Sequence, residues 1–182
     1  MLETIRDYAT ERLIESDEYE PLRQAHARYF LTLAEQAEPE LTGAHQADWL
    51  ERLEGEHDNL RAALGWAREQ NAAETALRLA GALWRFWYTR GYLSEGRRWL
   101  DQALAMVGNG LPVLHAQAAA SQPDDAQIQK TSMAVRAKAL TGAGGLAYAQ
   151  GDYASAQTCY EASLALFRES GNTASGVAKP WE

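Results

Sequence analysis

The sequence predicts an all-α fold in which antiparallel helix hairpins stack into a short α-solenoid of about seven helices. Apolar residues recur at helical spacing along almost the whole chain. No stretch alternates between apolar and polar residues for long enough to predict a strand. Two later segments, centred on Gly91 and Gly151, resemble each other, and each reads as a helix, a short turn and a second helix. Stacked repeats of this kind form solenoids.

Residues 1–70 are predicted to form a helical adaptor. Its first helix, over 2–16, is amphipathic and therefore needs a partner surface. The second begins near Pro21, because proline lacks the N–H that would have no partner in a first helical turn, and it closes at Pro39 and Gly43. The apolar face of the first helix consists of Ile5, Tyr8, Ala9 and Leu13.

A third, long helix is predicted from His45 to about Gln70, with Gly55 as a candidate kink. Its apolar positions are separated by three or four residues, which indicates one buried stripe. The stripe consists of Trp49, Leu53, His57, Leu60, Leu64 and Ala67.

The two similar segments are predicted to be helix pairs, over 71–106 and 131–172, with a short tail at 173–182. Between them, residues 107–130 contain glycines, prolines and an Ala/Gln-rich middle without an aromatic residue. This stretch is predicted to be a flexible insertion, with a short helix over 113–120 as an option. A longer surface loop costs little free energy, so both pairs can still stack.

The second pair resembles the tetratricopeptide repeat (TPR). If the repeat is numbered from Ala137, its small eighth and twentieth positions are Gly144 and Ala156, and its aromatic twenty-fourth position is Tyr160. Small residues let two helices approach closely, and a large residue fills the space they leave. The first pair is a degenerate copy, with Trp84 at the eighth position. We expect Trp84 to pack against the preceding helices, as in an atypical capping repeat.

A wider resemblance covers most of residues 2–107 and 134–171. The stretches LETIRDYATERL, WLERLEGEHDNLRAALGWA and ALWRFWYTRGYLSEGRRWLDQAL are similar to the region that follows the nucleotide-binding and winged-helix domains of bacterial signal-transduction ATPases. That family includes LuxR-type and antibiotic-regulator-type transcription factors. The resemblance implies that the chain is a fragment of a larger regulator.

The TPR resemblance also implies a concave binding groove, lined by the first helix of each pair. Arginine and lysine beside tyrosine would suit an acidic peptide or an acidic helix of the same protein. Arg78, Arg85, Tyr88, Thr89, Lys138, Thr141 and Tyr148 are the side chains that would form it.

The sequence carries no recognisable catalytic constellation, cofactor motif or metal site. It has no G-x-x-x-x-G-K-[ST] phosphate loop, and Glu54, His57 and Asp58 do not form an H-E-x-x-H motif. We therefore expect His57 to form a hydrogen bond inside a helix interface. The cluster Gly142, Gly144 and Gly145 follows no predicted strand, so close helix packing explains it better than a dinucleotide site.

The sequence predicts a cytoplasmic protein without a membrane span, because its start lacks the features of a secretory signal and its longest apolar stretch is interrupted by arginines. Residues 1–70 hold 16 acidic residues against 7 arginines, which disfavours a phosphate backbone, and nucleic acid is therefore not an expected partner of this piece. Cys159, the single cysteine, cannot form an intramolecular disulfide. Leu164 and Phe167 on the last helix would be exposed if the solenoid stops there, so self-association is also expected.

Two alternatives to a protein-interaction scaffold remain open. One is a sensor that binds a small effector among Arg85, Trp87 and Tyr88. The other is a nucleic-acid surface built from arginines that lie near aromatic residues. Those arginines are Arg78, Arg85, Arg90, Arg97 and Arg98.

Overall fold

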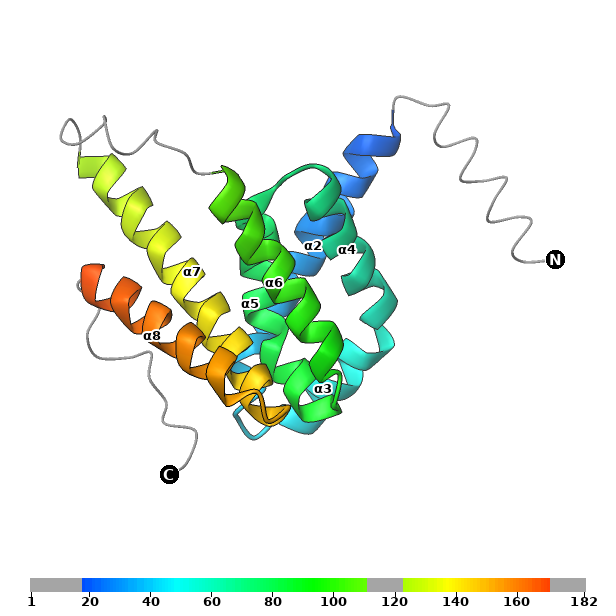
Figure 1. Cartoon of the computed structure of the whole chain (residues 1–182). Coiled ribbons are helices and arrows are strands. Elements are labelled where there is room, and N and C mark those ends of the chain that lie inside the picture. The colour runs from blue at the N-terminus through cyan, green and yellow to red at the C-terminus, as the bar shows by residue number, and fades with distance from the viewer. Residues whose placement is uncertain (1–17, 111–122, 171–182) are drawn as a thin grey trace.

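A computed structural model of the chain describes residues 18–110 and 123–170, and over these ranges it contains seven helices and no strand (Figure 1). This confirms the prediction of an all-α fold. The predicted helices over 2–16 and 113–120 and the tail at 173–182 lie outside the described residues. The helices are α2 (Tyr19–Glu40), α3 (Gln46–Gly55), α4 (His57–Glu69), α5 (Ala73–Arg90), α6 (Leu93–Gly110), α7 (Pro123–Ala149) and α8 (Tyr153–Glu169).

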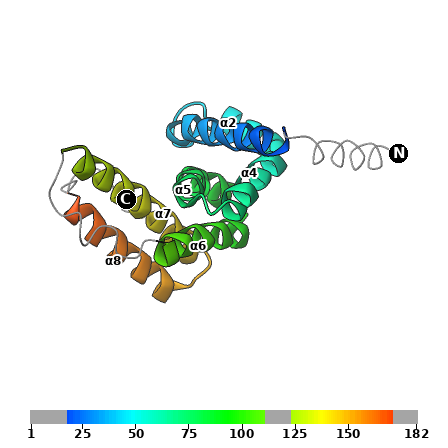
Figure 2. The same ribbon diagram turned by 90° about the horizontal axis from the view of Figure 1, so that it is seen from above.

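The helices form three successive layers, which Figure 2 shows from above. The first layer consists of α2 and α4, the second of α5 and α6, and the third of α7 and α8. Helix α5 lies at the centre, because it contacts α2 and α4 on one side and α7 on the other. Its buried face is almost continuous, with Leu79, Leu83, Phe86 and Trp87 at most 1% exposed. None of the described helices is both long and apolar enough to span a bilayer.

The helix predicted from His45 to Gln70 is divided in two at Gly55 and Glu56. Glu56 leaves helical geometry, with φ −102° and ψ 9°, and α4 starts immediately after it. The predicted apolar stripe is nevertheless buried along α4, at Leu60, Leu64 and Ala67. The periodicity therefore identified the buried face correctly, and the candidate kink at Gly55 marks the place where the helix is divided. Neither signal predicted that α4 packs along α2.

The turns of the two similar helix pairs have the same backbone conformation. Gly91 and Gly151 are both left-handed, with φ values of 81° and 78°. This region is strained for residues with a side chain, so glycine is the natural choice at both positions. In the second pair Asp152 follows the glycine and caps α8, because its Oδ1 accepts a hydrogen bond from the Ser155 N–H at 3.2 Å.

The insertion predicted over 107–130 is partly helical. Helix α6 continues to Gly110, and α7 begins at Pro123, so helices occupy both ends of the stretch. The start of α7 follows the usual rule, since proline suits the first helical position. Residues 111–122 lie outside the described part of the chain.

Glycines on α7 allow large aromatic side chains to approach from two sides. A Cβ atom added at Gly142 would lie 2.8 Å from Cβ of Trp84, and one at Gly144 would lie 3.0 Å from Cε1 of Tyr160. The glycine cluster is therefore a packing feature, as its sequence context predicted. Trp84, however, packs against α7, which follows it, and the expectation that it packs against the preceding helices was wrong. Two small residues, Gly142 and Gly145, make the space that its ring occupies.

Candidate functional site

Helix α2 covers one half of the predicted groove. Arg78 on α5 donates two hydrogen bonds to Glu35 on α2, from Nε to Oε1 at 2.8 Å and from Nη2 to Oε2 at 2.9 Å. Lys138 on α7 donates to Oε2 of Glu38 at 2.7 Å, one turn further along α2. Arg78 and Lys138 were predicted to bind either an acidic peptide or an acidic helix of the same protein. In the structure both contact carboxylates of α2, a helix of the same chain.

The Arg78–Glu35 pair has the parallel two-bond geometry that gives guanidinium–carboxylate contacts their specificity. The hydrogen bond that Arg78 donates to Glu35 is the main reason why the pKa of Arg78 is raised. Both side chains remain about a third exposed, so solvent weakens their attraction. The pair serves mainly to fix the position of α2 over α5.

The coupling between Arg78 and Glu35 can be measured with a double-mutant cycle. Arg78→Ala and Glu35→Ala should each lower the free energy of unfolding slightly, and the double variant should lose less than the sum. We expect a coupling of about 0.5–1 kcal/mol at low salt, which is usual for a partly exposed pair. Urea unfolding at two salt concentrations measures it. Strictly additive losses would show that the contact does not hold α2.

The other half of the predicted groove, near the C-terminal ends of α5 and α7, is open. Arg85 lies over the ring of Trp84, 4.5 Å from its centroid, and no carboxylate pairs with it among the described residues. Tyr88 and Tyr148 are 51% and 44% exposed. Thr89 is exposed beside them. We call Arg85, Tyr88 and Tyr148 the open half of the groove, and it offers a cation and two aromatic rings to a ligand.

Two residues assigned to ligand sites from the sequence are used inside the fold. Thr141 is directed toward α8, where its Oγ1 lies 2.9 Å from Oγ of the buried Ser163. It therefore joins the two helices of one hairpin and does not line the groove. Trp87, which was considered for an effector site, is only 1% exposed and cannot contact an effector without unfolding of the core.

Most of the arginines considered for a nucleic-acid surface form contacts within the chain. Besides Arg78, Arg90 lies 3.5 Å from Glu54, and Arg97 lies 2.9 Å from Asp152. Arg98 lies over Trp99, with 5.5 Å between the guanidinium carbon and the ring centroid. Arg78, Arg90 and Arg97 are thus paired with acidic residues elsewhere in the fold, so the arginines do not form one continuous free basic stripe.

A polar cluster around the buried His57 joins α4 to α6. Glu95 accepts two hydrogen bonds from Arg61, at 2.7 and 2.6 Å, and its Oε1 lies 3.4 Å from Nε2 of His57. The bonds from Arg61 are the main cause that lowers the pKa of Glu95. Aromatic rings of Phe86 and Tyr92 enclose the histidine. The cluster is structural, and the described residues contain no group of three potential metal ligands.

A second groove, which the sequence did not predict, lies between α2 and α4. It has a volume of about 520 Å³. Its position depends on the pairing of two helices that are about 40 residues apart in sequence. Periodicity shows which face of a helix is apolar, but it does not show which other helix packs against that face, so the groove could not be predicted. We call it the α2–α4 groove, and its lining residues are Leu22, Arg23, His26, Ala62, Gly65, Trp66 and Glu69.

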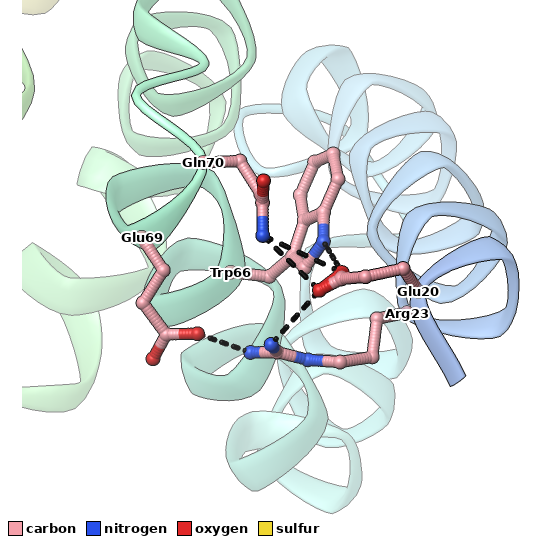
Figure 3. Close-up of polar contacts among 5 residues, drawn as sticks. All are labelled: Glu20, Arg23, Trp66, Glu69 and Gln70. Carbon is pink, nitrogen blue, oxygen red and sulfur yellow. Dashed lines mark hydrogen bonds and ion pairs between the residues drawn. The ribbon is translucent and has the colours of Figure 1, made fainter. Parts of the chain in front are cut away.

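Polar contacts connect the two helices along one edge of this groove (Figure 3). Glu20 accepts hydrogen bonds from Nε1 of Trp66 at 3.4 Å and from Nε2 of Gln70 at 3.1 Å. Arg23 bridges the helices, because its Nη2 donates to Oε2 of Glu69 at 2.5 Å while its Nη1 lies 3.4 Å from Glu20. The charged groups at this edge therefore have partners on the protein.

Three curated proteins are similar to part of the chain. Two are from strains of Mycobacterium tuberculosis and one is from Mycobacterium bovis, and each is named "Putative HTH-type transcriptional regulator". Each is 38% identical over 104 residues, which is 57% of this chain but only 12% of the relative's length. The chain thus spans about an eighth of the relatives it matches. No family model matches it, and no solved structure does.

These relatives correct the expectation that nucleic acid is not a partner. Helix-turn-helix regulators, the class in which they are named, place a recognition helix in the DNA major groove. The acidic composition of residues 1–70 is a local property and does not exclude DNA as a partner of a regulator that contains such a segment. Charge was the wrong basis for that exclusion, because it was counted over 70 residues of a chain that matches only 12% of the length of these relatives.

Proposed function

We propose that the chain is a non-catalytic helical scaffold within a transcription regulator. The similarity to named regulators supports a regulatory role, and their greater length supports its being one region of a larger protein. The shared left-handed glycine turns and the Gly144–Tyr160 packing support tetratricopeptide-like repeats. In the bacterial signal-transduction ATPases that the sequence resembles, an ATPase core precedes the corresponding region. We propose the same domain order for this protein.

One observation carries the scaffold role. Helix α2 is held over the groove by ion pairs from α5 and α7, while the open half of the same groove keeps a cation without a carboxylate partner among the described residues and two exposed aromatic rings. A surface of this kind is suited to recognition, since aromatic residues and arginine contribute most to protein interfaces. We propose that it contacts another domain of the same regulator or a second protein.

Site-specific photocrosslinking tests the scaffold role. We would replace Tyr88 with p-benzoylphenylalanine in the protein as expressed in its source organism, and use Gln157, which is exposed on α8, as the matched control position. We expect a defined crosslinked protein segment from position 88 but not from position 157. Arg85→Glu should abolish that product, because it reverses the charge of the open half. Identical products from both positions, or none from either, would refute the proposal.

A small effector with a carboxylate is the second candidate for the same surface. The observation that favours it is that Arg85 lies against Trp84 with Tyr88 nearby, since Trp84 and Tyr88 have ring centroids 6.3 Å apart. The buried position of Trp87 leaves fewer aromatic contacts than the sequence suggested. Thermal-shift screening with carboxylate metabolites separates the two candidates, because stabilisation that Arg85→Glu abolishes would favour an effector.

A further inference from the structure

The first helices of the two pairs, α5 and α7, carry matching side chains 60 residues apart, which is also the spacing of the two left-handed glycines. The helices lie side by side in this register, because Gly142 and Gly145 of α7 pack against Trp84 of α5. Matching positions are therefore neighbours across the two helices. Two such pairs of side chains are Arg78 with Lys138, and Tyr88 with Tyr148.

The first of these pairs already holds an acidic helix. Arg78 donates to Glu35 of α2. Lys138 donates to Glu38, which lies three residues further along α2 and therefore on the same side of it. Helix α2 is anchored in the core, where Ala34 is 0% exposed, so it is a fixed part of the fold. The molecule thus shows which kind of segment fits across α5 and α7, namely a helix with carboxylates on one side.

Arg85 is the next cation along α5 on the same side. It follows Arg78 by seven residues, which is two helical turns and about 10 Å along the axis. Two packed helices have axes about 8–10 Å apart. Arg85 therefore lies about one helix width beyond the contact of α2, and it has no carboxylate partner among the described residues. A second acidic helix beside α2 would present its carboxylates there.

We propose that the open half of the groove binds an acidic helix of the partner, seated beside α2. This inference rests on the proposed function and gives the partner of that surface its chemistry. Arg85 takes a carboxylate, as Arg78 does on the covered half. Tyr88 and Tyr148 offer their rings to apolar side chains of the same helix. Tyr153 extends this surface, since it is 64% exposed and its ring centroid is 5.4 Å from that of Tyr148.

Charge complementarity favours an acidic protein helix over the other macromolecules that an arginine beside aromatic rings could bind. A basic segment would place a like charge against Arg85. A nucleic acid is bound through several phosphates, and the open half contains one cation, because the neighbouring Arg78 and Lys138 are already paired with carboxylates.

Selection from a displayed library of short helical peptides tests the proposal on the full chain. The peptides are fused to the display protein at their C-terminus, so they offer no free terminal carboxylate. We expect the selected peptides to carry aspartate or glutamate beside an apolar residue in clear excess over the unselected library. Selection of neutral or basic peptides, or of none, would overturn the proposal.

Affinity measurements by fluorescence anisotropy then assign the contact to Arg85. Arg85→Glu should raise the Kd of a selected peptide at least about fivefold, and a peptide with lysine in place of its acidic residue should bind this variant better than the unaltered chain. Arg136→Glu is the matched control, because Arg136 is exposed and lies two residues from Lys138, on the opposite side of α7. Equal losses from the two variants would contradict the proposal, provided that circular dichroism shows both to be folded.

Two further outcomes separate this inference from the alternatives. Displacement of the peptide by a short single-stranded oligonucleotide at lower concentration than by unlabelled peptide would overturn it and identify nucleic acid as the occupant. A photocrosslink from position 88 to a partner segment without acidic residues would also overturn it, while the scaffold role would stand. The failure of this inference and the failure of the proposed function are therefore distinguishable.

Discussion

Replacing Trp87 with alanine is expected to lower the free energy of unfolding by about 3–5 kcal/mol, the usual cost of removing a large buried aromatic side chain. Trp87 is 1% exposed on α5, the central helix. Its ring packs so closely against α6 that a Cβ atom at Gly96 would lie 2.8 Å from Cε3. The cavity would open between the two helices of the middle layer, where little rearrangement can fill it. Urea unfolding followed by circular dichroism measures the loss.

Tyr88 is the matched control, because it is the next residue on the same helix and is also aromatic. It is 51% exposed, so Tyr88→Ala should change the free energy of unfolding by less than about 0.5 kcal/mol. The pair of variants separates the two uses of the aromatic segment, which are core packing for Trp87 and surface recognition for Tyr88. Equal losses from both variants would mean that the middle layer is not packed as described.

The helices could be predicted from sequence because each has a local cause. The apolar residues of α4 and α5 recur at helical spacing, and Gly91 and Gly151 occupy turns that need a left-handed residue. Pro39 shows the limit of such signals. It lies inside the last turn of α2, which continues to Glu40, because proline in a final turn disturbs only that end.

The candidate site was harder to predict because it depends on helices that are distant in sequence. The carboxylates that pair with Arg78 and Lys138 lie 43 and 100 residues away along the chain. A repeat pattern identifies the positions on the concave side, but it does not show that α2 covers half of them. Thr141 illustrates the same limit. Its repeat position predicted that the side chain lines the groove, but its hydrogen-bond partner on α8 holds it on the side that faces α8.

Trp84 was placed against the wrong neighbours for a related reason. Its bulk at a position that is usually small suggested a capping repeat, but the compensating small residues are Gly142 and Gly145 on the following hairpin. Each glycine alone fits several explanations. Only the contact between α5 and α7 shows that one large residue and two small ones form a single packing unit.

Gly142→Ala is expected to destabilise the protein, although alanine normally stabilises the interior of a helix by up to about 1 kcal/mol relative to glycine. The new methyl group would lie 2.8 Å from Cβ and 2.9 Å from Cγ of Trp84. These atoms are close to the α5 backbone and cannot rotate away, so the helices would have to separate. Overpacking of this kind costs about 1–3 kcal/mol, and we expect a net loss of about 1–2 kcal/mol in chemical unfolding.

Gly65→Ala provides the opposite expectation within the same protein. Gly65 lies inside α4, and a Cβ atom there meets nothing within 4 Å among the described residues. Its replacement should therefore raise the free energy of unfolding by about 0.5–1 kcal/mol through the lower chain entropy of alanine. Opposite signs for the two substitutions would show that Gly142 is required by the approach of Trp84 and not by the backbone of α7. If Gly142→Ala also stabilised the protein, α5 and α7 could not be in the close contact described above.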